Sequence, residues 1–293
     1  MSPHPRGGLL ESPPAPMPEL LTAVDVCNAL PQSRLFQEYV QTTYLVVDPS
    51  SLDPVWILAA NFVRKQPREW QAFTYGMTES TRALSALFVT APLGLHAKAL
   101  LDKKPPAAVP SDAPADFTRY HERLYLKQQA CRFNTLIRSA AAACPGLRAS
   151  DTARYLALMA EQHAPGKYST YHGLADRTIE GMQYELGVSA LLGMLGRGHF
   201  TSDQDEDLAS CDFWLGEGTV PIPCKVKASP RPDMAGDEVH GYYRRNHRGV
   251  IEVTPPLERW EFRDQLLLPV DAAQYHAKPF GLLLQAIEQT AAA

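Results

Sequence analysis

The sequence predicts an α/β protein of the α+β kind, in which a helical N-terminal region precedes a domain with a small mixed β-sheet flanked by helices. Apolar and aromatic residues recur at helical spacing from about Leu20 to Leu101. Short alternating runs, which are typical of strands, gather after residue 198. A last amphipathic run ends the chain. Helices, then strands, then a helix favour a mixed class over an all-helical or all-strand one.

The first half divides at proline-rich segments. Residues 1–19 are rich in proline and glycine and predict a disordered segment, with Met17 as an alternative natural start. Residues 20–102 and 116–165 predict two helical regions, and in the first of them Leu84, Leu87 and Phe88 fall on one side and predict core. Residues 103–115 hold four prolines among small and polar residues, a composition that predicts a linker.

Residues 166–293 predict the α/β domain. A helix is expected over Asp176–Leu195, ending at Gly196, and a last helix over Pro279–Thr290. The segment from His240 to Gly249 is expected to be a loop. Four strands are expected, at His199–Thr201, Asp212–Leu215, Val220–Lys227 and Gly249–Thr254.

The composition is that of a soluble globular chain. Among 293 residues, 45% are hydrophobic and 20% charged, and the formal net charge is -4, so attraction to phosphates must come from local basic groups. The five cysteines are dispersed without zinc-ligand spacing, which predicts reduced thiols in the cytoplasm. No run approaches the roughly 18 apolar residues of a membrane span, and no phosphate-binding loop, nucleophile elbow or HExxH motif is present. We expect a cytoplasmic protein with no membrane partner.

The strand Val220–Lys227 has two chemically different faces. Ile222, Cys224 and Val226 point to one side, so Lys225 and Lys227 point to the other. Two ammonium groups two residues apart repel each other unless anionic groups lie opposite them. This face is therefore expected to meet carboxylates or phosphates.

Two carboxylates precede these lysines along the chain. The turn at Gly216-Glu217-Gly218 predicts a hairpin that brings Asp212 near Lys227. Glu185 lies on the helix upstream, and a helix packed on the sheet can deliver its carboxylate to the same place. Glu185, Asp212 and Lys227 are the candidate catalytic residues.

Residues 181–229 resemble the core of the PD-(D/E)xK, or restriction-endonuclease-like, nuclease superfamily. Its members share a helix, a β-hairpin with a third strand, a further helix and a fourth strand. The resemblance implies a magnesium-dependent endonuclease, in which Glu185 and Asp212 hold Mg²⁺ or Mn²⁺ and Lys227 positions the attacking water. It rests on the runs Gly181-Met182-Gln183-Tyr184-Glu185, Gly198-His199-Phe200, Cys211-Asp212-Phe213 and Ile222-Pro223-Cys224-Lys225-Val226-Lys227-Ala228-Ser229.

Two positions depart from the superfamily pattern. Cys211 replaces a proline that has no chemical role, whereas Lys225 stands where the family places Glu or Gln, and an ammonium group is no ligand for a hard cation. Either a carboxylate from elsewhere, such as Glu217, Glu180 or Glu252, completes the site, or the fold is catalytically inactive and keeps a basic face.

A second group of residues predicts contact with nucleic acid, with DNA expected before RNA. The basic residues Lys225, Arg244, Arg245 and Arg248 are suited to phosphates, and Tyr242 and Tyr243 to stacking on bases. Three functions stay open: a nuclease, an inactive nuclease fold that binds nucleic acid in repair, defence or regulation, and a structural or assembly protein. A homodimer also stays open.

Overall fold

The computed structural model describes residues 79–103, 114–163, 166–197, 199–200, 211–216 and 221–292. Its helices are α5 (Glu79–Lys103), α6 (Pro114–Ala143), α7 (Ala149–His163), α8 (Tyr168–Leu195) and α10 (Val270–Ala292), with a 3₁₀ helix η2 (Arg259–Phe262). Its strands are β1 (His199–Phe200), β2 (Phe213–Leu215), β3 (Ile222–Val226), β4 (Ala235–Asp237), β5 (Gly241–Arg245) and β6 (Ile251–Thr254). None of the helices in these ranges is long and apolar enough to cross a membrane.

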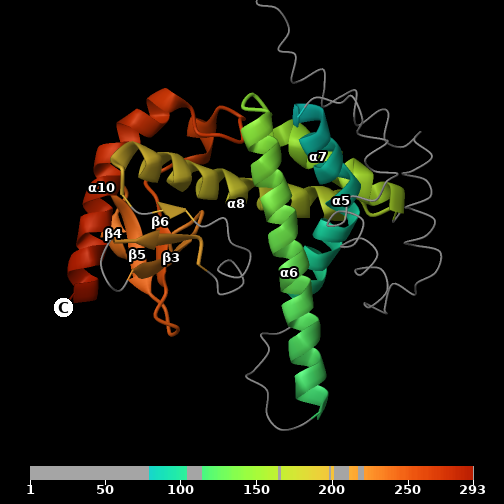
Figure 1. Ribbon diagram of the computed structural model, residues 1–293, viewed down its shortest axis with the longest axis horizontal. Helices are drawn as coiled ribbons and strands as arrows, with labels where there is room; N and C mark the ends of the chain where they lie inside the picture. Colours follow the sequence, from blue (N-terminus) through green and yellow to red (C-terminus); the bar gives the residue numbers. More distant parts are fainter. Residues whose placement is uncertain are drawn as a thin grey trace, which may run out of the picture.

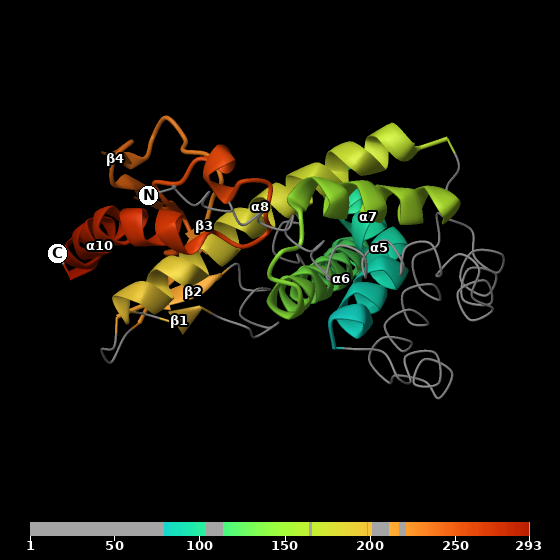
Figure 2. The same ribbon diagram turned by 90° about the horizontal axis from the view of Figure 1, so that it is seen from above.

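Two hydrophobic cores lie at opposite ends of this arrangement. Helices α5, α6 and α7 gather at one end, and the sheet and α10 lie at the other (Figures 1 and 2). The first core includes Leu84, Leu87 and Phe88, all fully buried, which confirms their prediction as core. The second core packs the sheet against α8 and α10.

Helix α8 takes part in both cores. Leu174, Ile179 and Met182 in its first half pack with the helical core, whereas Val188 and Leu191 in its second half pack with the sheet. The helix begins at Tyr168 rather than at the predicted Asp176, and Gly196 ends it in the left-handed conformation (φ 59°) as predicted. The predicted boundary at residue 166 therefore does not separate two independent cores.

The sheet is mixed, which confirms the α+β class. Its strand order is β1-β2-β3-β6-β5-β4. Only the pair β3–β6 is parallel among the described strands; the other four neighbouring pairs are antiparallel. The parallel pair places Lys225 opposite Glu252, and the antiparallel pair β5–β6 places Arg244 opposite the same glutamate.

Two predicted boundaries in this part are wrong. The segment after His240 is not a loop, because Gly241–Arg245 forms strand β5 and pairs with both β4 and β6. The last helix begins at Val270, and Pro279 lies inside it. Packing overrides the proline here, since Ala273 and His276 before it and Phe280 after it lie on one buried face.

Several predicted segments lie outside the described residues. These are the disordered segment 1–19, most of the helical region 20–102, nearly all of the linker 103–115 and the turn residues Glu217 and Gly218. Helix α6 begins at Pro114, so the last two residues of the predicted linker are helical.

Two glycines in helix interiors make a matched pair for a test of the first core. A Cβ atom at Gly94 would overlap the ring of Phe133, whereas one at Gly181 would meet nothing within 4 Å. We expect Gly94→Ala to lower the free energy of unfolding by about 1 to 3 kcal/mol through overpacking. Gly181→Ala, by contrast, should raise it by up to about 1 kcal/mol through helix propensity. Urea unfolding of both variants measures this, and equal effects of one sign would contradict the packing at Gly94.

Candidate functional site

Strand β3 separates an apolar face from a charged face, as predicted. Cys224 and Val226 are buried in the core of the sheet, under α8 and α10. Lys225 and Lys227 lie on the other face, with side chains that are 26% and 27% exposed. Burial raises the pKa of the Cys224 thiol far above its usual range, so this cysteine is a packed apolar group rather than a nucleophile.

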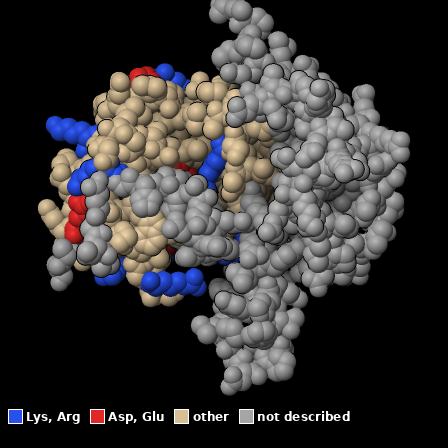
Figure 3. Space-filling view, viewed as in Figure 1, with Lys and Arg blue, Asp and Glu red and all other residues tan. Residues whose placement is uncertain are grey.

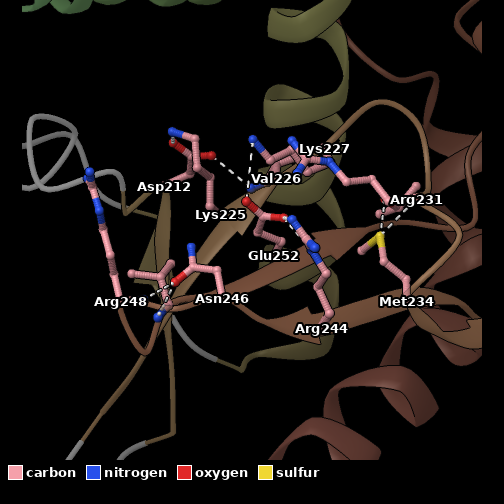
Figure 4. A network of polar contacts seen from close by, with 12 residues as sticks. Asp212, Lys225, Val226, Lys227, Arg231, Met234, Arg244, Asn246, Arg248 and Glu252 are labelled. Atoms are coloured by element: carbon pink, nitrogen blue, oxygen red, sulfur yellow. Dashed lines mark hydrogen bonds and ion pairs between the residues drawn. The ribbon is translucent and has the colours of Figure 1, made fainter. Parts of the chain in front are cut away.

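Charges of alternating sign run across the sheet on the second face. Asp212 precedes β2, Lys225 is in β3, Glu252 is in β6 and Arg244 is in β5 (Figure 4). The strand register puts Glu252 opposite both Lys225 and Arg244. We call these four residues the charged row. Because opposite charges directly across a sheet attract each other, each member of the row stabilises its neighbours.

Asp212 is the most buried member of the charged row, with 2% of its surface exposed. Its Oδ2 atom accepts a hydrogen bond from the backbone N–H of Val226 at 2.7 Å. Its own N–H donates to the carbonyl of Cys224 at 2.8 Å, and the Lys225 Nζ atom lies 3.7 Å from Oδ1. The carboxylate therefore holds β2 against β3 and turns a negative charge toward Lys225.

Glu252 joins two cations of the same face. Arg244 donates from Nε to its Oε2 atom at 2.7 Å, and the Lys227 Nζ atom lies 3.8 Å from its Oε1. Arg244 also pairs with Asp233. Burial alone would raise the pKa of Glu252, but the hydrogen bond from Arg244 and the charge of Lys227 outweigh it, so the pKa lies below its usual value. Glu252 is thus an anion at neutral pH.

The surroundings of Lys227 disfavour the positive charge of its ammonium group. Burial and the nearby ammonium group of Lys225 lower its pKa, and Glu252 offsets only part of this effect. An added anion would favour the charged form of Lys227. This lysine is therefore suited to binding a phosphate group.

The hairpin that connects β5 to β6 extends the basic surface. The Asn246 Oδ1 atom accepts hydrogen bonds from the N–H groups of Arg248 and Val250, and Gly249 adopts a positive φ of 81°. This turn leaves Arg248 exposed, whereas Arg245, the last residue of β5, is exposed on the opposite side of the sheet from Arg244. In the space-filling view, Lys and Arg side chains are more prominent than Asp and Glu on the described part of the C-terminal half (Figure 3).

The remaining predicted residues lie in different surroundings. The Tyr243 hydroxyl contacts Thr290 Oγ1 of α10 at 3.0 Å, and its ring packs on the core of the sheet, so it faces away from the charged row. Tyr242 is half-buried. Glu185 on α8 accepts a hydrogen bond from Arg138 of α6 at 2.7 Å. The structure thus brings Asp212, Lys225, Lys227 and Arg244 together, and places Glu185 in a different ion pair.

The carboxylates near the predicted metal site already have cationic partners in this arrangement. Within the described ranges, no three His, Cys, Asp or Glu side chains are grouped so that they could hold a metal ion. The two carboxylates of the charged row each face a cation already, Asp212 facing Lys225 and Glu252 facing Lys227 and Arg244. An ammonium or guanidinium group in that place repels Mg²⁺ or Mn²⁺.

Comparison of the chain with protein-family models, curated proteins and solved structures gives no match.

Proposed function

We propose that the charged face of the sheet binds the sugar–phosphate backbone of nucleic acid, with DNA as the first expected partner. The observation that supports this most strongly is the charged row, in which buried carboxylates hold Lys225 and Arg244 in place. Lys227, beside the row, is half-buried and lies next to a like charge. Phosphate oxygens are the natural acceptors for such cations.

The charge balance of this face is positive. The cations Lys225, Lys227, Arg231 and Arg244 outnumber the carboxylates Asp212, Asp233 and Glu252 by four to three. The exposed Arg248 of the β5–β6 hairpin raises the difference from one to two. The net charge of the whole chain is -4, so a cationic face on an anionic protein directs a polyanion to one place.

The strand order supports a nuclease-like fold in part. Helix α8 is followed by the antiparallel strands β1, β2 and β3, and β6 then pairs in parallel with β3. This agrees with the resemblance to the PD-(D/E)xK superfamily. The superfamily's second helix would lie between β3 and β6, where residues 227–250 form the β4–β5 strand pair instead. We favour the binding form without catalysis, because Lys225 takes the place of a metal-binding carboxylate.

A double substitution tests the binding proposal. We expect Lys225→Gln/Lys227→Gln to weaken binding to a fluorescent DNA duplex on the order of tenfold and to lower the salt slope of log K by about 2, one phosphate contact per lysine. Fluorescence anisotropy over a salt series, with single-stranded DNA and RNA in parallel, measures both quantities. The variant leaves the buried Asp212 carboxylate without a charged neighbour, which destabilises the fold. Circular dichroism therefore checks that the variant is folded.

Two further variants make the result interpretable. Arg248→Gln removes only one exposed hairpin charge, so it should weaken binding while the fold stays intact. Lys167→Gln/Lys278→Gln removes two exposed lysines, at the start of α8 and on α10, and should leave binding unchanged apart from a small effect of net charge. Equal affinity of the wild type and all three variants would refute the proposal.

Metal-dependent cleavage of phosphodiester bonds is the second candidate. The observation that favours it is that two carboxylates flank β3. The Asp212 Oδ1 atom lies 3.7 Å from the Lys225 Nζ atom on one side, and Glu252 is the register partner of Lys225 on the other. Incubation of labelled single-stranded, duplex and branched DNA and of RNA with Mg²⁺ or Mn²⁺ tests it. Cleavage that Asp212→Asn abolishes, with binding retained, would replace the binding proposal by a nuclease.

A further inference from the structure

A pocket of about 560 Å³ lies at the end of β6, where α8, η2 and α10 meet. Its wall includes Tyr242 of β5 and residues of all three helical segments, and it contains none of the members of the charged row. The pocket is therefore separate from the charged row and has a chemistry of its own.

Aromatic rings form part of the wall of this pocket. Trp260 of η2 is 75% exposed, although a tryptophan side chain is among the largest apolar groups to leave in water. Tyr242 lies on the same wall. An exposed indole beside a hollow provides a flat, electron-rich surface for a ligand.

The wall is also acidic. Glu180, Glu238 and Glu258 line the pocket, and Arg259 is the one lining Lys or Arg within the described chain. That guanidinium is already held by Asp176 at 2.7 Å and lies 3.8 Å from Glu180. Burial, followed by the negative charges of Glu258 and Glu180, raises the pKa of Tyr184 to about 12. The glutamates that line the pocket outnumber its one arginine, and this charge balance disfavours phosphates and favours cations.

His276 adds an unused hydrogen-bonding atom to the wall. It is 8% exposed, and its Nε2 atom lies 2.5 Å from Oε1 of Glu261. A neutral imidazole that donates from Nε2 to this carboxylate presents Nδ1 as an acceptor. Within the described part of the chain, this Nδ1 atom is buried and has no hydrogen-bond partner. A ligand with N–H donors can supply the missing bond.

We propose that this pocket binds an organic cation with N–H donors, of the guanidinium or primary ammonium class. Trp260 stacks on the cation, the glutamates supply the opposite charge and His276 accepts a hydrogen bond. A neutral ligand of the same shape lacks the charge that Glu180, Glu238 and Glu258 match, and an anion is repelled by them. The proposal does not depend on nucleic-acid binding, because it concerns a different set of residues.

Isothermal titration of the full chain with N-acetyl-L-arginine methylamide tests the proposal, and the citrulline analogue serves as a neutral probe of the same shape. We expect the arginine probe to bind at least tenfold more tightly than the citrulline probe. Trp260→Ala should weaken its binding about fivefold or more. Val270→Ala is the control, because Val270 is an exposed apolar residue of α10 (65% exposed) that lies outside this pocket, so its truncation should leave binding unchanged.

A second probe separates the two sources of such a cation. Spermidine represents a free polyamine, and the arginine probe represents a side chain of a protein. Binding of either one that weakens severalfold in Glu238→Gln, an exposed turn position, supports the pocket as a cation site. The proposal is overturned if neither probe binds, if citrulline binds as tightly as arginine, or if Trp260→Ala and Val270→Ala have equal effects.

Discussion

Replacement of Asp212 by alanine is expected to lower the free energy of unfolding by about 3 kcal/mol. The substitution removes the acceptor for the Val226 N–H, which is left without its 2.7 Å bond, and the carboxylate that faces Lys225. Breaking a buried ion pair from one side costs about 3 to 5 kcal/mol, and the partial exposure of Lys225 places the loss at the lower end. Urea denaturation followed by circular dichroism measures it.

The amide variant separates the two contributions. Asp212→Asn keeps an oxygen that accepts from Val226 N–H and loses only the charge, so its loss should be roughly half that of Asp212→Ala. If both variants were as stable as the wild type, Asp212 would not hold β2 against β3. Under the binding proposal, Asp212→Asn also binds DNA at least as tightly as the wild type, because the face gains one unit of positive charge.

Glu252→Gln is expected to remove part of the acid sensitivity of the protein. The pKa of Glu252 in the folded chain is below its usual value, so its contribution to stability is present above about pH 4.3 and is lost as the pH falls through the folded value. The variant leaves Lys227 and Arg244 without their shared carboxylate and should be less stable at pH 7 by about 2 to 3 kcal/mol. The two stability curves should converge toward pH 3.

Urea midpoints measured between pH 3 and pH 8 give both curves. Glu238→Gln, which removes an exposed carboxylate, should change the free energy of unfolding by less than about 0.5 kcal/mol across this range. A constant difference between Glu252→Gln and the wild type at every pH would show that Glu252 is held by packing and not by its charge.

The features of the charged face that depend on residues close together in the sequence could be predicted. Alternation along a strand has a period of two, so the sides taken by Cys224, Val226 and the two lysines follow from their positions alone. The short connection between β2 and β3 also allowed Asp212 to be placed near this pair. The structure places it beside Lys225, at 3.7 Å, and Lys227 beside Glu252.

The contacts of the charged face between residues far apart in the sequence could not be predicted. Glu252 was one of three carboxylates within reach, and only the parallel pairing of β3 with β6 places it opposite Lys225. Nothing local in the sequence determines the register between strands that lie more than twenty residues apart. The same pairing explains why Gly241–Arg245 is a strand, because it occupies the free edge of β6. The sequence Tyr-Tyr-Arg-Arg predicts a loop when it is considered without β6, the strand with which it pairs.

The resemblance to a nuclease also depends on one position. Lys225 stands where a metal-binding carboxylate is expected, and the structure gives it the place between Asp212 and Glu252. A cation between two buried anions reduces the repulsion that they would otherwise exert on each other across β3. Lys225 therefore contributes to the stability of the sheet as well as to the positive surface.

The division of α8 between two cores has a consequence for protein fragments. A fragment that begins at residue 166 keeps the whole helix but loses the partners of Leu174, Ile179 and Met182, leaving an apolar stripe in water. Such a fragment would self-associate instead of folding as an isolated module. For the same reason, melting of either half exposes part of a helix that the other half needs, so heat should unfold both halves in one cooperative transition.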